Sequence, residues 1–397
     1  MGASAGGLQA FTQLLRHLNR NAGVALVLVQ HLAPGHESAL TELLGRSTEM
    51  PVAEVTEGTR VQSDHVYVIP PDRDMEVRDG VLRLVPRVKT RPHLPIDHFL
   101  ASLAEDQGNK AIGVIFSGTA SDGTLGLKSI KAAGGITFAQ DPEKANHGEM
   151  PRNAIAAGWV DSVLPIEGIA NELMRIAEHP YLRMLPQGEG PEVVPKGEND
   201  LQKVYRALRT VSGVDFTNYK SNTIRRRIMR RMMLLKIDAL KRYAQYVNEN
   251  HGEAEVLFRD VLIHVTRFFR DSEVFDALKA LVFPALVKDR SPETPIRIWV
   301  AGCSTGEEVY SLAICLLEFL SNASSAQDLQ ILATDVNNDA LDKARQGEYP
   351  DNIAADVSQE RLRRFFVRLP HGYRVNKSVR DICIFARHDI AKDPPFS

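Results

Sequence analysis

A serine near the start of the chain lies where a nucleophile can act. Ser4 stands in the sequence GASAGG at residues 2–7, and a helical pattern of apolar residues follows over residues 8–18. Small residues permit a tight turn, and the start of a helix offers backbone N–H groups that suit an anion or an oxyanion. Such a serine can attack a carbonyl group if a base and an orienting group are close to it.

A histidine and an aspartate follow two other apolar segments. His31 follows the run at residues 24–29, and Asp122 follows the run at residues 112–116. Because the carboxyl ends of parallel strands gather along one sheet edge, we predict that both side chains meet Ser4 there. The pattern alone leaves other interpretations open. The serine turn can bind phosphate or simply pack closely, the histidine can be an ordinary strand-end residue, and the aspartate can cap a turn or a helix.

Two acidic residues mark a second candidate site later in the chain. Residues 297–308 (RIWVAGCSTGEE) predict a strand, a turn of small residues and a helix, and the apolar run at 331–335 ends in Asp335. In this Rossmann pattern a cofactor approaches the backbone, and the strand-end acid accepts hydrogen bonds from a ribose. Glu307 and Asp335 disfavour a pyrophosphate and favour a cationic ligand such as S-adenosylmethionine. The pattern alone also admits other nucleotides or a packing role.

The elements that must position these residues alternate between strand and helix through residues 1–180. This alternation predicts an α/β domain with a doubly wound parallel sheet. Asp79 and Gly80 suit a type I′ turn, so residues 76–84 predict a β-hairpin. We expect strands at 24–29, 66–69 and 112–116, and helices at 8–18, 37–44, 96–104 and 125–133.

The composition changes after this first domain. The sequence PQGEGPEVVPKGEND is rich in Pro, Gly and Glu, so we interpret residues 181–200 as a linker. Residues 201–285 have an entirely helical pattern, and strands and helices alternate again over residues 286–397. We therefore expect an all-helical subdomain followed by an incomplete Rossmann-like domain.

The overall composition is that of an ordinary globular protein of several domains. The 397 residues are 44% hydrophobic and 25% charged, with a net charge of −2, so no global field favours nucleic acid or an anionic membrane. No apolar run reaches the roughly 20 residues that a membrane-spanning helix needs. The start of the sequence shows no signal peptide. Three cysteines without metal-binding spacing predict no metal site and fit a reducing cytoplasm.

Residues 2 to about 175 resemble the catalytic domain of chemotaxis protein-glutamate methylesterases. The resemblance rests on GASAGG, VQHL, RPHLPIDHFL, GVIFSGTASDGTLGL and AQDPEKANHGEMPRNAIAAGWVD. It implies that Ser4 is the nucleophile, His31 the general base and Asp122 the partner that orients the histidine.

The sequence departs from this family in three ways. Ala5 stands where a threonine is common, and residues 117–123 read SGTASDG where many members read TGMGxDG. The family also has a strand before its serine, so we expect a poorly anchored turn at Ser4 and a natural chain that begins earlier. A receiver domain does not precede the esterase in this sequence, and we therefore do not expect the usual control by phosphorylation.

Residues from about 201 onward resemble chemotaxis receptor-glutamate methyltransferases. The resemblance rests on VTRFFRD, RIWVAGCSTGEEVYSLA and ILATDVNNDALDKARQGEY. It implies S-adenosylmethionine as the cofactor. Arg270 is then expected near the reacting groups, Ala301 and Glu307 at the methionine part, Asp335 at the ribose and Asp389 beside the adenine.

A strongly basic segment at residues 223–231 is a candidate binding surface. Nucleic acid binding is disfavoured by the low net charge and by the lack of interleaved aromatic residues, and a solvated face stays open. The resemblance favours docking of an acidic helical protein through Arg225, Arg226 and Arg230. We expect that partner to be the cytoplasmic helices of a methyl-accepting chemoreceptor.

Together these features predict a bifunctional cytoplasmic enzyme that hydrolyses and forms methyl esters on receptor glutamates. The expected later parts of the methyltransferase do not follow before Ser397, so we expect weak transferase activity from this sequence. Two alternatives stay open: a small-molecule esterase joined to a methyltransferase, and a scaffold that binds receptor without catalysis.

Overall fold

The structure is a computed structural model that divides into two compact units, one ending at Ile263 and the other formed by the rest of the chain. Most of the predicted linker at 181–200 lies outside the described residues, and helix α8 begins at Glu198. The structure describes residues 1–31, 40–87, 93–179, 198–263, 266–288, 295–322, 328–370 and 372–394.

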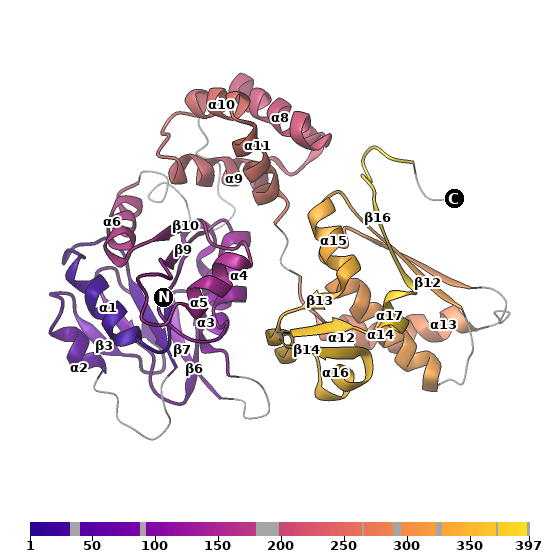
Figure 1. Ribbon diagram of the computed structural model, residues 1–397, viewed down its shortest axis with the longest axis horizontal. Helices are drawn as coiled ribbons and strands as arrows, with labels where there is room; N and C mark the ends of the chain where they lie inside the picture. Colours follow the sequence, from indigo (N-terminus) through magenta and orange to yellow (C-terminus); the bar gives the residue numbers. More distant parts are fainter. Residues whose placement is uncertain are drawn as a thin grey trace. The chain divides into compact units, whose positions relative to one another are not determined.

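The first unit is built on a seven-stranded sheet in the order β10-β9-β8-β1-β2-β5-β3. All of its strand pairs are parallel. The first strand lies in the centre and the chain winds outward from it in both directions, so the predicted doubly wound parallel sheet is confirmed (Figure 1). The strands are β1 (Gly2–Ala3), β2 (Leu26–Gln30), β3 (Val52–Glu54), β5 (Val66–Val68), β8 (Ile112–Ile115), β9 (Ile136–Gln140) and β10 (Ser162–Leu164).

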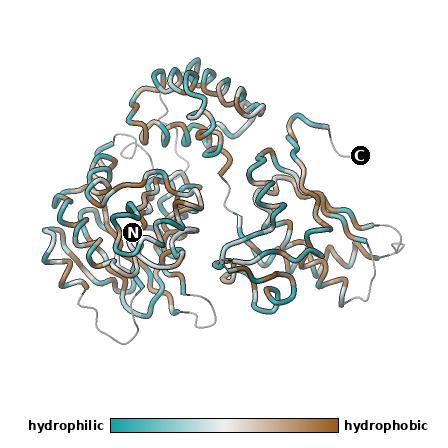
Figure 2. Tube along the Cα trace, viewed as in Figure 1, coloured by the Kyte–Doolittle hydropathy of each residue, from teal (hydrophilic) through white to brown (hydrophobic). Residues whose placement is uncertain are grey.

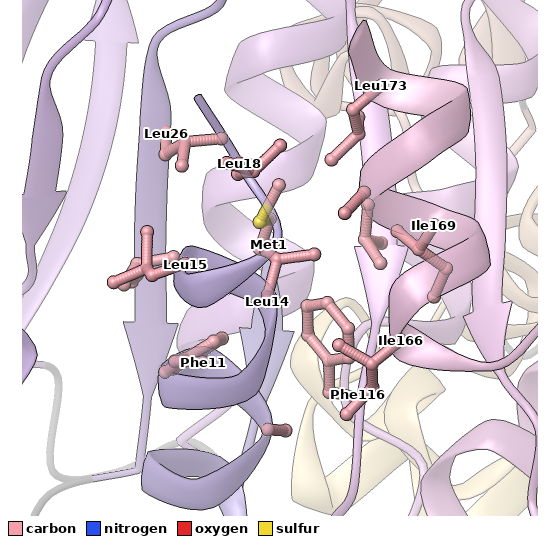
Figure 3. Close-up of a cluster of buried hydrophobic side chains, with 14 of the residues drawn as sticks. Met1, Phe11, Leu14, Leu15, Leu18, Leu26, Phe116, Ile166, Ile169 and Leu173 are labelled. Atoms are coloured by element: carbon pink, nitrogen blue, oxygen red, sulfur yellow. The ribbon is translucent and has the colours of Figure 1, made fainter. Parts of the chain in front are cut away.

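Helices cover both faces of this sheet because each presents one apolar stripe. On one face Phe11 and Leu14 of α1 meet Ile169 and Leu173 of α6 (Figure 3). On the other face α3 and α4 pack against the sheet through a second apolar cluster. The helices are α1 (Gly7–Arg16), α2 (Leu40–Gly45), α3 (Pro95–Gln107), α4 (Thr124–Ala132), α5 (Glu149–Ala156) and α6 (Ile166–Ala177).

The expectation of a poorly anchored serine turn is wrong. Although β1 has only two residues, Gly2 pairs with Val29 of β2 and with Ile115 of β8. Both neighbours are buried strands, and they fix the backbone directly before Ser4.

A small antiparallel sheet lies beside the main one and confirms the predicted hairpin. Strands β6 (Arg73–Arg78) and β7 (Val81–Pro86) are joined by Asp79 and Gly80, whose φ values are 53° and 70°. Positive φ at both central residues is the signature of a type I′ turn. Strand β4 (Thr59–Arg60) completes this sheet.

Among the described residues, four amphipathic helices complete the first unit. Figure 2 shows hydrophilic and hydrophobic residues alternating along them. They are α8 (Glu198–Ser212), α9 (Ser221–Leu234), α10 (Leu240–Glu249) and α11 (His251–Val261). Together they form the helical subdomain. It belongs to the same compact unit as the esterase-like sheet.

The expected end of the helical subdomain at residue 285 differs from the observed division. Helices α12 (Ser272–Ala277) and α13 (Phe283–Val287) belong to the second unit. Their Phe275 and Phe283 share an apolar core with Ile296 and Leu316. A helical pattern shows that a segment is helical, whereas the core that it joins depends on tertiary packing.

The second unit has a parallel three-stranded sheet in the order β11-β12-β16. Helix α14 crosses from β11 to β12, as in a Rossmann-like unit. The strands are β11 (Ile296–Ala301), β12 (Leu329–Asp335) and β16 (Cys383–Arg387), and the main helices are α14 (Glu307–Asn322), α15 (Asn338–Gln346), α16 (Gln359–Phe365) and α17 (Lys377–Arg380). An antiparallel sheet of β13 (Glu348–Tyr349), β14 (Phe366–Leu369) and β15 (Gly372–Val375) follows α15.

Within the described ranges, no helix has both the length and the apolar character needed to cross a membrane. The same residues hold no group of three or more His, Cys, Asp or Glu side chains arranged to bind a metal ion. Cys303, Cys315 and Cys383 are free thiols, and all three are buried.

Candidate functional sites

The Ser4 turn joins β1 to α1 at the carboxyl edge of the sheet. The Ser4 N–H donates to the Ser117 carbonyl oxygen at 3.0 Å, which ties the turn to the end of β8. Gly6 caps α1 with φ at 80°, a left-handed conformation that favours glycine. A Cβ atom at Gly6 would also come within 2.7 Å of Ser117 Oγ. A glycine is therefore required here if α1 is to start directly beside the serine.

Ser4, His31 and Asp122 lie in series at this edge. His31 Nδ1 lies 3.2 Å from Ser4 Oγ, and His31 Nε2 lies 2.8 Å from Asp122 Oδ2. The three residues follow β1, β2 and β8, the central strands around which the sheet winds in opposite directions. A parallel sheet binds ligands at this switch point. The structure thus brings together all three residues that the sequence predicted for the first site.

The start of helix α3 holds the Asp122 carboxylate. The backbone N–H groups of Ile96 and Asp97 donate to its two oxygens at 3.1 and 2.9 Å. The Asp122 side chain is 1% exposed, whereas the His31 side chain is 29% exposed. A buried acid with fixed donors can orient a half-exposed imidazole. The sequence pattern did not reveal these donors, although the proline at position 95 is typical of a first helical turn.

Ser117 connects three parts of the site and was also missed. Its Oγ donates to the Ala5 carbonyl oxygen at 2.8 Å and accepts from the His147 N–H at 2.9 Å. Its own N–H donates to Gln140 Oε1 at 3.0 Å. One buried hydroxyl therefore links the serine turn, the end of β8 and the loop before α5. The only sequence signal was its position directly after a strand.

An open pocket of about 520 Å³ lies over Ser4 and His31. Its wall includes the first turn of α1, and Gln30 and His147 line other sides. Backbone N–H groups at a helix start favour negative charge. The pocket therefore offers a nucleophile, a base and a region suited to an oxyanion, which are the parts of an acyl-transfer site.

The histidine uses its ring nitrogens in a defined way. Asp122 accepts only hydrogen bonds when it is ionised, so Nε2 must carry the proton that points to it. Nδ1 is then an acceptor and can take the proton of Ser4 Oγ. This is the division of roles in a Ser-His-Asp triad, with the two ring nitrogens exchanged relative to the usual template.

The second candidate site begins at the tight turn between β11 and α14. Gly302, Ser304 and Gly306 have φ values of 71°, 48° and 91°. A Cβ atom at Gly302 would meet nothing within 4 Å, so the space beside this exposed turn is open to a ligand. Ala301 ends β11 next to it and is itself exposed.

Two buried carboxylates flank this turn. Asp335, at the end of β12, accepts hydrogen bonds from the Ser304 and Asn337 N–H groups at 2.8 and 2.9 Å. Glu307, the first residue of α14, accepts from the Thr305 hydroxyl at 2.6 Å. Each carboxylate oxygen keeps capacity for further donors. Burial and the neighbouring Asp335 charge raise the pKa of the Cys303 thiol to about 12, so this thiol stays protonated.

Arg270 and Asp389 lie in loops of the same unit. Arg270 stands between Phe269 and Asp271, two residues with positive φ, and the Phe269 N–H donates to Ser311 Oγ on α14. Ser311 Oγ in turn donates to the Glu307 carbonyl oxygen, so this loop is tied to the acidic turn. Asp389 follows β16 and caps its own turn by accepting from the Ala391 N–H at 3.0 Å.

The positions of the predicted residues fit a cationic nucleoside. Ala301, Asp335 and Asp389 follow or end the three parallel strands at their carboxyl edge. Strand β12 pairs with β11 up to Thr334 and with β16 up to Asp335. Glu307 lies one tight turn beyond Ala301. Two buried acids beside an open backbone turn suit the ammonium and ribose hydroxyl groups of S-adenosylmethionine.

The prediction that Arg230 docks an external partner is wrong. Its side chain is 1% exposed and contacts Asp161 and Asp260 within the first unit. Arg226 is exposed and Arg225 is half-buried. Residues of one basic segment lie on different faces of a helix, so their charge alone does not show which of them reach solvent.

The first unit thus holds an α/β domain with a serine-hydrolase site together with the helical subdomain, and the second is a Rossmann-like domain with an acidic ligand turn. A separate family model matches each of these three parts. Residues 1–173 match the CheB methylesterase model, residues 199–262 the all-alpha domain of CheR methyltransferase, and residues 264–397 the SAM binding domain of CheR methyltransferase. The chain therefore carries a CheB methylesterase domain followed by the all-alpha and SAM binding domains of a CheR methyltransferase.

Two individual relatives match different shares of the chain. A protein from Rhodobacter capsulatus, the "Uncharacterized 104.1 kDa protein in hypE 3'region", is 37% identical over 379 residues, which are 90% of this chain and 40% of that protein. The "Protein-glutamate methylesterase/protein-glutamine glutaminase 2" of Pseudomonas aeruginosa is 36% identical over 182 residues, or 45% of this chain and 52% of that protein. The chain thus spans about half or less of the length of these relatives.

A solved structure also resembles the first part of the chain. The "Crystal structure of Thermotoga maritima CheB methylesterase catalytic domain" is 31% identical, and the match covers 44% of this chain and 95% of that one with a TM-score of 0.42.

Proposed function

We propose that this protein hydrolyses and forms methyl esters on glutamate side chains of chemoreceptors in the cytoplasm. The observation that carries the hydrolytic half is the series of contacts from Ser4 Oγ to His31 Nδ1 and from His31 Nε2 to Asp122. The matches to the CheB and CheR family models support the pairing of an enzyme that removes the methyl ester with one that forms it. A methyl ester removes one negative charge from the receptor, and hydrolysis restores it.

The proposed hydrolysis proceeds by acyl transfer. Ser4 Oγ attacks the ester carbonyl carbon while its proton moves to His31 Nδ1, and the imidazolium that forms is stabilised by Asp122. His31 then gives the proton to the departing methoxide, which leaves as methanol. Water attacks the glutamyl–serine ester with His31 again as the base, and the free glutamate is released. The start of α1 favours the negative charge of the carbonyl oxygen at each stage.

The direct test is methanol release from methylated receptor fragments by the Ser4→Ala variant. We expect a fall in kcat of at least about 10³-fold, because the nucleophile of a triad cannot be replaced by methyl. Ser63→Ala is the matched control, because Ser63 is exposed and away from the site. Equal methanol release by the wild type and Ser4→Ala would exclude the triad. Activity on small methyl esters but none on receptor fragments would favour the small-molecule alternative.

For the second half we propose that Arg270, Ala301, Glu307, Asp335 and Asp389 hold S-adenosylmethionine. The bound cofactor would supply an electrophilic methyl group, and a glutamate carboxylate with a pKa near 4.3 is already a nucleophile at neutral pH. Glu307 would balance the ammonium group and Asp335 would accept hydrogen bonds from the ribose. The protein would otherwise contribute placement and exclusion of water.

Calorimetry with S-adenosylhomocysteine tests this pocket without relying on turnover. We expect Asp335→Asn to weaken binding at least about tenfold, because an amide replaces one acceptor with a donor. Asp339→Asn is the matched control, because Asp339 is exposed in the first turn of α15. Equal affinity of both variants would exclude the assignment of Asp335 to the ribose. Binding without turnover on receptor fragments would favour the scaffold alternative.

Receptor docking is proposed for the exposed part of the basic segment. Arg226, with Arg225 beside it, can meet the acidic surface of a receptor helix, where each rim charge mainly affects the association rate. The charge reversal Arg226→Glu should slow association with receptor fragments and reduce its dependence on salt. An unchanged association rate would remove Arg226 from the docking surface.

A further inference from the structure

The basic helix α9 packs against the esterase domain. Its buried contacts lie at the end of the sheet opposite the triad. Arg230 projects from α9 and is 1% exposed. Its Nε donates to the Gly135 carbonyl oxygen at 2.8 Å, and its two terminal nitrogens contact Asp161 and Asp260. Gly135 and Asp161 directly precede β9 and β10. These contacts therefore lie at the amino edge of the parallel sheet, opposite the edge that carries Ser4.

A fourth charge makes this cluster neutral. Lys131 Nζ lies 3.1 Å from Asp161 and 3.9 Å from Asp260. Lys131 and Asp161 come from the esterase domain, whereas Arg230 and Asp260 come from α9 and α11 of the helical subdomain. Each side thus contributes one cation and one anion. Buried charges are stable only with such partners, because removing one of them leaves another uncompensated.

A second arginine of α9 binds the end of a helix. The two terminal nitrogens of Arg227 donate to the carbonyl oxygens of Lys131 and Ala132, in the last turn of α4. The Lys131 carbonyl also accepts from the Gly134 N–H at 3.1 Å, just beyond the helix. Both carbonyls carry the negative end of the helix dipole. Arg227 is 5% exposed, so its guanidinium group is not accessible to an external partner.

Further contacts extend the interface along α9. Met233 is buried in the same apolar core as α1 and α6 of the esterase domain. Arg175 of α6 donates to the Met233 carbonyl oxygen at 3.2 Å, and Lys236 lies 2.9 Å from Glu172 of α6. The interface therefore combines apolar packing, helix capping and paired charges. This combination is typical of a specific domain interface and not of an incidental contact of two basic residues.

We infer that α9 is the element that fastens the CheR-type helical subdomain to the CheB-type domain, and that the partner of its Arg227 and Arg230 face is the amino edge of the esterase sheet. The interface leaves the Ser4 edge uncovered. It also removes these two arginines from any surface that docks a receptor or a nucleic acid. This inference does not depend on the proposed chemistry of either half.

The test is to cleave the chain between the esterase domain and the helical subdomain and to measure whether the two fragments remain associated. A site-specific protease sequence is placed between residues 185 and 195 of the 397-residue protein, and the cleaved protein is analysed by size-exclusion chromatography at micromolar concentration. We expect the two fragments of the wild type to elute together. Elution as two separate fragments would overturn the inference.

Variants identify the contacts that hold the fragments. Arg230→Gln should raise the dissociation constant of the cleaved protein at least tenfold, whereas Arg226→Gln, on the exposed face of the same helix, should leave it unchanged. Equal behaviour of these two variants would overturn the role of the cluster. Arg231→Gln serves as the folding control, because Arg231 pairs with Glu253 inside the helical subdomain.

A substitution in the esterase domain tests the same contact if a substitution in α9 impairs folding. Should Arg230→Gln lose helical circular dichroism, Asp161→Asn tests the same contact from the esterase domain. The double variant should weaken association less than the product of the two single effects, because both remove one shared interaction. Independent, multiplicative effects would show that the two side chains do not act together.

Discussion

At the scale of single residues, the first site depends on three side chains whose orientation is fixed by neighbours. Ser4 is anchored through its backbone to Ser117, and Asp122 is held by two backbone donors of α3. Asp122 is buried, whereas Ser4 and His31 are partly exposed, as suits groups that meet substrate and water. The residue types predicted the chemistry, whereas Ser117 acquired its linking role only from the packing of distant loops.

Ala120 is a strained residue beside this site. Its φ is 67°, a conformation that costs a residue with a Cβ atom about 1–2 kcal/mol. Its carbonyl oxygen accepts from Asn153 Nδ2 at 2.7 Å, which holds the loop in place. Ala120→Gly should therefore raise the free energy of unfolding by about 0.5–1 kcal/mol, after the greater freedom of glycine in the unfolded chain is subtracted.

Urea denaturation followed by circular dichroism measures this change. Ala133→Gly, at the end of α4 with an ordinary helical φ, is the matched control and should be destabilising. A lower stability of Ala120→Gly would show that the positive φ carries no strain.

At the scale of elements, helices α3 and α4 stabilise each other through their first turns. Asp122, just before α4, accepts from the first N–H groups of α3, and Asp97 in the first turn of α3 accepts from the Gly126 N–H of α4 at 2.6 Å. Each helix thus receives an acid from the other at the positive end of its dipole. This reciprocal arrangement also places the carboxylate that orients His31.

Asp97 should therefore act as a positioning residue for the esterase. We expect Asp97→Ala to lower stability by about 1 kcal/mol, the usual cost of a lost capping group. It should also lower kcat for methanol release several-fold with little change in KM, because the side-chain bond that fixes α3 to α4, and so holds the backbone donors of Asp122 in place, is lost. Asp97→Asn keeps an acceptor oxygen and should restore most of both losses.

Enzyme kinetics on methylated receptor fragments and thermal unfolding provide the two measurements. A loss of stability with unchanged kcat in Asp97→Ala would limit this residue to a structural role.

At the scale of the whole molecule, the chain divides differently from its families. The helical subdomain belongs by family to the methyltransferase, yet it packs within the compact unit of the esterase. Buried charges at that interface make its stability depend on pH. Burial raises the pKa of Asp161, but the nearby Arg230 and Lys131 charges outweigh this effect and hold the pKa below its usual value of 3.8.

This shift predicts a loss of stability in acid. Because the folded protein holds the Asp161 proton less tightly than the unfolded chain, the stabilisation is complete well above pH 4 and is lost as the pH falls below it. The unfolding free energy of the first unit, measured from pH 6 to pH 2, should therefore decline more steeply in the wild type than in Asp161→Asn. Parallel curves for the two proteins would show that Asp161 carries no such linkage.

The sequence by itself determined the chemistry of the sites and the class of each domain. Short-range patterns predicted most strands and helices of the first domain, the Asp79–Gly80 hairpin, and the strand-end positions of Ser4, His31, Asp122 and Asp335. Such features follow from local sterics, apolar periodicity and the rule that parallel strands end at one edge.

Only the tertiary structure decided which surfaces are covered. The basic segment of α9 predicted a charged face, but Arg230 lies in a neutral buried cluster whose other members come from residues 131, 161 and 260. In the same way, only the tertiary structure shows that α12 and α13 pack in the apolar core of the second unit and that Ser117 links three loops. Long-range pairing depends on the packing of segments that are distant in sequence, and no local pattern records which partner a side chain will meet.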